Sequence, residues 1–157
     1  MTTLAVNIKF TKAITQFTNY RFSSMCNFNG TPLGVNDLGL FKLTGDTDNT
    51  ESIDASFTPV LSMYGKLSSK RMRQVYLSFM STGTLKFIVK DANGKVYSYP
   101  FRCAKVGEQQ YKRLIITRGI HKVYWDYTIE NENGADFSID LITCMFINRS
   151  PGHNDPV

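Results

Sequence analysis

Apolar and polar residues alternate along most of this chain with a period of two. The clearest runs are Leu4–Phe10, Val75–Phe79, Leu85–Val89 and Phe137–Thr143. This period puts successive side chains on opposite faces of an extended strand. No stretch keeps the 3.6-residue period of an amphipathic helix. The pattern therefore predicts an all-β chain of about nine or ten short strands.

Asn-Gly pairs separate several of these runs. They occur at Asn29-Gly30, Asn93-Gly94 and Asn133-Gly134, and both residue types tolerate the left-handed backbone of a tight turn. We predict a hairpin at the first pair, a three-stranded meander over Val75–Phe101, and a turn region over Asn131–Gly134. One further strand is expected over His121–Glu130, with Trp125 pointing inward.

Strands and turns at this spacing favour an antiparallel β-sandwich, jelly-roll-like, with an N-terminal strand and hairpin extension. A chain of 157 residues suits one domain. We divide that domain into an N-terminal region (1–44), a sandwich core (45–148) and a flexible tail or docking arm (149–157). The last strand lies close to the end of the chain, so we expect the whole protein and not one module of a large spike.

Charge and cysteine content add little to this picture. The formal net charge is +5, which a solvated basic surface explains without a partner. Cys26, Cys103 and Cys144 are widely spaced, as expected of reduced thiols in a chain folded in cytoplasm. The N-terminus has no signal-peptide pattern, and no apolar run reaches the roughly 18 residues of a membrane span. We therefore expect no membrane partner.

No catalytic constellation is visible. The histidines are His121 and His153, and no Ser, Cys or Asp lies in a recognisable nucleophile motif. We predict that the chain is not an enzyme and carries no cofactor.

An acidic loop is a candidate calcium site. Asp46, Asp48 and Glu51 supply hard oxygen ligands. The spacing starts like an EF-hand loop but lacks the glycine at its sixth position and the glutamate at its twelfth. A solvated loop with no metal is the favoured interpretation.

A basic run suggests acidic partners. It contains Lys66, Lys70, Arg71 and Arg73, in a segment predicted to be a connection. Nearby tyrosines could stack bases, as in nucleic-acid-binding β domains. Lysine and arginine also guard exposed strand edges against unwanted pairing. We favour the second explanation, so nucleic acid is not an expected partner, although a nucleic-acid-binding domain stays an alternative.

A carbohydrate-binding, lectin-like module is another alternative. Trp125, Tyr97 and Tyr99 could form an aromatic platform for a sugar. That function requires an exposed Trp125, whereas one Trp in a sandwich is more often buried.

Several segments resemble small virion proteins of tailed bacteriophages. They share a basic strand entry, an R-G…Y-W strand and an N-x-x-G-A-D-F hairpin near the C-terminus. The resemblance covers residues 44 to 148 approximately. The matching segments are Lys70–Leu77, Gly83–Phe87, Thr117–Trp125 and Asn133–Asp140, with Gly45-Asp46 and Ile53–Ala55 before them.

This resemblance implies a structural component of the virion, in the tail or the head–tail connection, made in the host cytoplasm. Its partners would be other virion proteins and copies of itself. The acidic residues Asp46, Asp48 and Glu51 would then meet the basic run of residues 66–73 on an adjacent copy.

Overall fold

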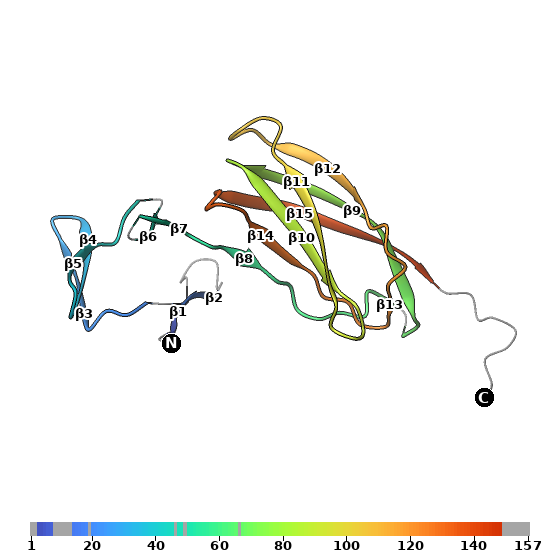
Figure 1. Ribbon diagram of the computed structural model, residues 1–157, viewed down its shortest axis with the longest axis horizontal. Helices are drawn as coiled ribbons and strands as arrows, with labels where there is room; N and C mark the ends of the chain where they lie inside the picture. Colours follow the sequence, from blue (N-terminus) through green and yellow to red (C-terminus); the bar gives the residue numbers. More distant parts are fainter. Residues whose placement is uncertain are drawn as a thin grey trace, which may run out of the picture. The chain divides into compact units, whose positions relative to one another are not determined.

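The computed structural model describes residues 3–7, 14–18, 20–45, 47, 48, 50–65 and 67–148. They belong to two compact units, Met1–Gly45 and Asp46–Val157, whose strands can be followed in Figure 1. All strand pairs are antiparallel, and the described residues contain no helix. The predicted all-β class is confirmed. The described part of the chain accordingly holds no helix that could cross a membrane.

The first unit contains two small sheets. Strand β1 (Thr3–Asn7) pairs with β2 (Ile14–Thr18). Strands β3 (Ser24–Phe28), β4 (Thr31–Asn36) and β5 (Gly39–Lys42) form a three-stranded sheet.

The turn between β3 and β4 is the two-residue hairpin that the sequence predicts. Asn29 and Gly30 both have positive φ, at 47° and 78°, as a type I′ turn requires. Within this sheet, Gly34 lies under the ring of Phe22, where a Cβ would come within 2.6 Å of a ring carbon. Phe22 also contacts Phe41, with ring centroids 5.8 Å apart.

The second unit begins with the hairpin of β6 (Thr47–Asp48) and β7 (Glu51–Ser52). Two larger sheets follow. The β10 sheet has the order β11 (Val96–Arg102), β10 (Thr84–Lys90), β14 (Thr128–Asn131), β8 (Ser56–Phe57). The β9 sheet has β9 (Lys70–Ser81) between β15 (Phe137–Asn148) and, on its other side, β12 (Gln110–Ile115) and β13 (His121–Lys122).

One hydrophobic core joins these two sheets, as in a β-sandwich. Both sheets contribute alternate apolar residues to it, so the period of two in the sequence corresponds to one inward-facing row per strand. The rows are Val75, Leu77 and Phe79 on β9, Leu85, Phe87 and Val89 on β10, and Ile129 on β14, with Phe101, Leu114, Ile116 and Trp125 completing the cluster.

The predicted meander over Val75–Phe101 is wrong in its first step. Strand β10 pairs with β11, but β9 lies in the other sheet, so the turn after Ser81 crosses from one sheet to the other. The turn at Asn133-Gly134 makes the same kind of crossing, because β14 and β15 also lie in different sheets. The turn predicted there is present, but the two strands that it joins do not pair as in the N-x-x-G-A-D-F hairpin of the resembled proteins. Short turns fit both arrangements, and alternation does not identify a strand's neighbour.

The single strand expected over His121–Glu130 is also wrong. Strand β13 ends at Lys122 and β14 begins at Thr128. Between them, Trp125 exchanges two main-chain hydrogen bonds with Ser62, at 2.9 and 3.1 Å. The inward orientation of Trp125 is confirmed, since its exposed fraction is 0%.

Candidate interaction surface

The outer face of the β9 sheet carries large apolar side chains. Because Val75, Leu77 and Phe79 point into the core, the residues between them point outward. The register with β12 and β15 extends this outward row across the sheet. Its members are Arg71, Gln74, Tyr76, Ser78 and Met80 on β9, Tyr111, Arg113 and Ile115 on β12, and Ser138, Leu141, Thr143, Met145 and Ile147 on β15.

Most of these side chains are accessible. Tyr111 is 82% exposed, Leu141 58%, Ile115 52% and Met145 50%. An exposed apolar patch of this kind is typical of an interaction site.

The β10 sheet has the opposite character on its own outer face. The residues that alternate with its buried row are mainly polar or charged, and the ion pair of Lys86 with Glu132 lies beside them at 3.0 Å. The outer faces of the two sheets thus differ, so the apolar face is a local property of the β9 sheet. The outward row of the β10 sheet is Thr84, Lys86, Ile88, Lys90, Val96, Ser98, Pro100, Arg102, Thr128, Glu130 and Ser56.

A shallow hollow of about 260 Å³ lies in the apolar face. Ser78 is buried in this region, and Tyr76, Tyr111 and Leu141 line the hollow with it. The small Ser78 side chain leaves the space between the larger ones. Gln109 donates from its Nε2 to the Ser78 hydroxyl and to the Asp140 carboxylate.

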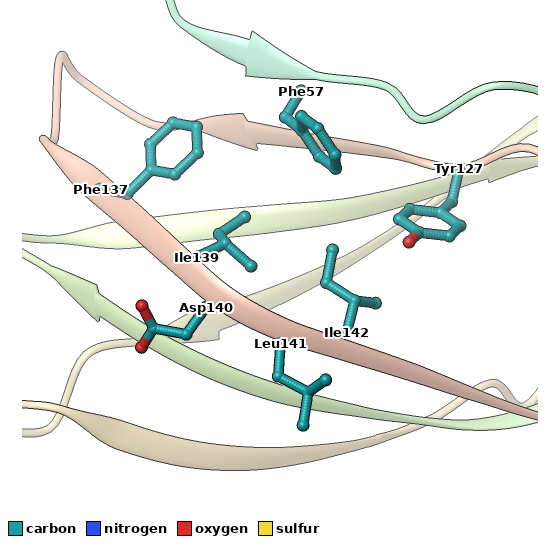
Figure 2. A pocket seen from close by; sticks show the side chains of 7 residues that line it. All are labelled: Phe57, Tyr127, Phe137, Ile139, Asp140, Leu141 and Ile142. Atoms are coloured by element: carbon teal, nitrogen blue, oxygen red, sulfur yellow. The ribbon is translucent and has the colours of Figure 1, made fainter. Parts of the chain in front are cut away.

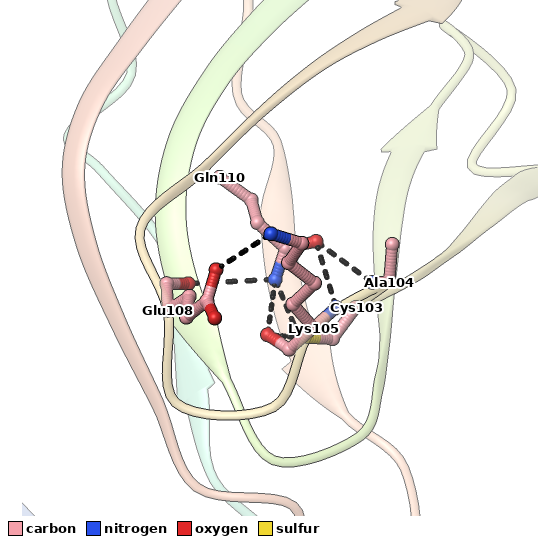
Figure 3. A network of polar contacts seen from close by, with 5 residues as sticks. All are labelled: Cys103, Ala104, Lys105, Glu108 and Gln110. Atoms are coloured by element: carbon pink, nitrogen blue, oxygen red, sulfur yellow. Dashed lines mark hydrogen bonds and ion pairs between the residues drawn. The ribbon is translucent and has the colours of Figure 1, made fainter.

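The loop before β12 is held by the Gln110 side chain (Figure 3). Its Oε1 accepts from the main-chain N–H of Ala104 at 2.7 Å and of Lys105 at 3.3 Å. Its Nε2 donates to the Lys105 oxygen at 2.7 Å and to the sulfur of Cys103. An exposed ion pair joins Lys105 to Glu108 at 3.1 Å. These hydrogen bonds fix the start of β12, the strand that carries Tyr111. No sequence motif predicted them.

A groove of about 410 Å³ runs beside β15. Figure 2 shows Phe137, Ile139 and Ile142 of β15 on one side of the strand, toward Phe57 and Tyr127, with Leu141 on the other side. Phe57 belongs to β8, so the groove lies where the edge strands of the two sheets face each other.

A β-bulge interrupts β15 at Asp140. Ile139 pairs with Phe79 and Leu141 with Ser78, which leaves Asp140 without a cross-strand partner. A bulge of this kind re-aims the side chains on either side of it. Asp140 is the one charged residue of β15.

Two titratable side chains near the groove, Cys144 and Tyr127, stay neutral at pH 7. Burial raises the pKa of the Cys144 thiol to about 12. Burial, with Cys144 and Tyr64 nearby, also raises the pKa of Tyr127. The Cys144 thiol and the Tyr127 hydroxyl therefore add no charge beside the groove, and Asp140 is the charged residue that lines it.

The structure corrects the expectation that all four basic residues of the run contact a partner. Lys66 lies outside the described residues. Lys70 is 1% exposed, and its Nζ donates to the main-chain oxygens of Met63 and Tyr64. Lys70 is therefore not a surface contact residue, because it sits at the inward-facing start of β9, where carbonyl groups satisfy its ammonium group.

The two arginines of the run are more accessible. Arg71 is half-buried and donates to the Thr117 oxygen at 3.3 Å. Arg73 is exposed and has no counterpart on β15, since Met72 pairs with Phe146 and Gln74 with Met145. Of the three basic residues that the structure describes here, Arg73 is placed best for contact with a partner.

The acidic loop is only partly described. Asp46 lies outside the described residues, whereas Asp48 and Glu51 are exposed and face each other across the β6–β7 hairpin. Within the described ranges, no three His, Cys, Asp or Glu side chains gather closely enough to hold a metal ion.

The alternative of a sugar platform requires an exposed Trp125, and the structure does not provide one. Trp125 is buried, and its Nε1 donates to the main-chain oxygens of Lys70 and Lys122 at 3.2 and 3.1 Å. Tyr97 and Tyr99 are half-buried and packed against the core. The indole therefore offers no surface to a ligand.

One feature of the sequence could have indicated the apolar face, but we interpreted that segment as an ordinary alternating strand. Leu141–Ile147 is almost continuously apolar, with large residues on both parities of the strand. Such a run is typical of a strand covered on both faces, yet the structure covers only one face of β15.

Comparisons of this chain with protein-family models, with curated proteins and with solved structures find no match.

Proposed function

We propose that this chain is a structural subunit of a tailed-bacteriophage virion, in the tail or the head–tail connection, and that it acts through protein–protein contacts. The proposal assigns the chain no catalytic step. It combines the resemblance of residues 44 to 148 to small virion proteins with the surface chemistry of the β9 sheet.

The observation that carries the proposal is the contrast between the two outer faces of the sandwich. A free-standing sandwich keeps both outer faces polar. Here one face follows that rule, and the other presents Tyr111, Ile115, Leu141 and Met145 to solvent. Covering that face removes apolar surface from water, at roughly 25 cal/mol per Å². Contact with another protein supplies such cover.

Side-chain chemistry favours a protein over nucleic acid as the occupant of this face. Tyr76, Tyr111 and Arg113 could stack on bases. Their neighbours Leu141, Met145 and Ile115, however, carry neither a positive charge nor a hydrogen-bond donor for a phosphate group. Aromatic residues, methionine and arginine together are the composition of a protein interface.

The experiment is to locate the chain in particles. Virions from cells expressing the chain with its phage are purified, and their proteins are measured by quantitative mass spectrometry. We expect a fixed whole-number copy count per particle and density for the chain in a particle map. A chain that is absent from virions and monomeric in solution would overturn the proposal. Binding to single-stranded DNA that falls steeply with salt would point to nucleic acid instead.

A further inference from the structure

We propose that the open edge of β15 pairs with the β15 edge of a second copy of this chain, which rests on the proposed structural role and names one partner for it. The segment concerned is Leu141–Asn148, eight residues or about 27 Å of strand. Within the described residues, β15 pairs only with β9, so its other row of main-chain groups has no strand beside it.

The other edges of the two sheets carry features that prevent pairing. Strand β11 contains Pro100 and ends on Arg102. Strand β12 contains Lys112 and Arg113, and β8 is only two residues long. Proline, basic side chains and short length are the recognised ways of blocking a sheet edge.

Strand β15 has none of these features after its bulge. Leu141–Asn148 has no charge and no proline, and its side chains alternate regularly between the two faces. The bulge at Asp140 limits pairing to the segment that follows it. This is the one unguarded long edge among those described for the two sheets.

The strand order indicates that a strand belongs at this edge. Numbered from β8, the pairing is that of a jelly roll without its first strand, which would pair with the last strand, here β15. The groove lined by Phe57, Phe137 and Ile142 lies beside that vacant position.

A second copy fits this position because the segment is complementary to itself. Antiparallel pairing of Leu141–Asn148 with its own copy places no like charges opposite each other in any register. A two-fold axis satisfies both open edges at once, which is the commonest symmetry of protein assemblies. The outer apolar faces of the two β9 sheets would then form one continuous surface.

The experiment measures self-association of the full chain by sedimentation over a range of concentrations. Thr143→Lys adds a positive charge near the centre of the segment. A two-fold contact contains this substitution once in each copy, so it brings two positive charges into the same interface. We expect the dimer dissociation constant to rise about tenfold or more. Ser98→Lys, on exposed β11, is the matched control and leaves it unchanged. Tyr111→Lys tests the far side of the same face and also leaves it unchanged. Circular dichroism checks that each variant is folded.

Hydrogen exchange on the unmodified chain tests the proposal without any variant. Amides in residues 141–148 become protected as the concentration rises, and those of β11 do not. Loss of association in both Thr143→Lys and Tyr111→Lys means that the face, not the edge, makes the contact, which overturns this inference. A wild-type chain that is monomeric at all concentrations overturns it too. In either case, detection of the chain in purified virions would still support the proposed function, whereas its absence from them would overturn that function as well.

Discussion

The indole Nε1 of Trp125 donates a hydrogen bond to the main-chain oxygen of Lys70 at 3.2 Å. This contact joins the connection between β13 and β14 to the first residue of β9. Trp125 also packs on Phe146 of β15, with ring centroids 5.6 Å apart. One side chain thus ties together three segments that are distant in sequence.

Replacing this indole by a smaller ring should destabilise the fold. In Trp125→Phe the carbonyl of Lys70 loses its donor and the core loses volume, so we expect unfolding to become easier by about 2–4 kcal/mol. Urea denaturation measures the change. Tyr124→Phe, at the exposed neighbouring position, should stay within about 0.5 kcal/mol. Fluorescence of Trp125, the only Trp of the chain, should resist quenching by iodide. Rapid quenching would contradict its burial.

The loop before β12 should depend on the Gln110 amide and not on the ion pair beside it. Gln110→Ala leaves the Ala104 N–H and the Lys105 oxygen without their partner, so we expect a loss of about 1–3 kcal/mol. Lys105→Ala removes an exposed ion pair and should cost about 0–1 kcal/mol. Thermal unfolding of both variants makes the comparison, and equal losses would show that the amide network is not what holds the loop.

Stability should fall in alkaline solution because Cys144 resists ionisation when folded. Its thiol has an ordinary pKa of 9.0 and a folded pKa of about 12. Between these values the unfolded chain releases the proton and the folded chain keeps it, so the free energy of unfolding falls by about 1.4 kcal/mol per pH unit for this group. Below pH 9 the effect is absent. Tyr64 and Tyr127 add to the loss above pH 10, because their pKa values are raised too.

The control for this pH dependence is Cys144→Ala. Urea denaturation at intervals from pH 8 to pH 11 should show a shallower decline for the variant than for the wild type. Identical slopes would mean that this thiol does not contribute.

The close approach of Gly34 to Phe22 predicts a local effect in the first unit. A methyl group at residue 34 would overlap the ring of Phe22, so Gly34→Ala should destabilise the β3–β4–β5 sheet by about 1–3 kcal/mol. Hydrogen exchange of the β4 amides reports it directly. Gly119→Ala, where an added Cβ meets nothing within 4 Å, is the control. Adding Phe22→Leu to Gly34→Ala should recover part of the loss, and no recovery would point to a cause other than the overlap.

Strand positions and inward-facing residues could be predicted from the sequence, because a strand with one buried face alternates apolar and polar residues. The inward rows of β9 and β10 and the burial of Trp125 are examples. Pairing partners did not follow, because Asn133-Gly134 has the same turn chemistry whether it joins neighbours in one sheet or strands in two. The burial of Lys70 depends on carbonyl groups of Met63 and Tyr64, which no spacing rule connects to it.

The candidate surface was harder to predict than the core. Basic and acidic runs drew attention to residues 46–51 and 66–73, whereas the structure draws it to Tyr111, Leu141 and Met145. The sequence alone does not distinguish these apolar side chains from core residues. Only the register between β9, β12 and β15 places them on the solvent side.

The position of β15 in the chain also determines when the fold can be completed during synthesis. Strand β9 pairs along its whole length with β15, and the two begin at Lys70 and Phe137. One side of β9 and the core residues that β15 covers therefore stay open to solvent until β15 leaves the ribosome. Long-range pairing of this kind folds slowly, and the unfinished sheet would attract other chains. The second unit should consequently close only after β15 has been synthesised and has left the ribosome, and truncation before Phe137 should yield aggregated protein.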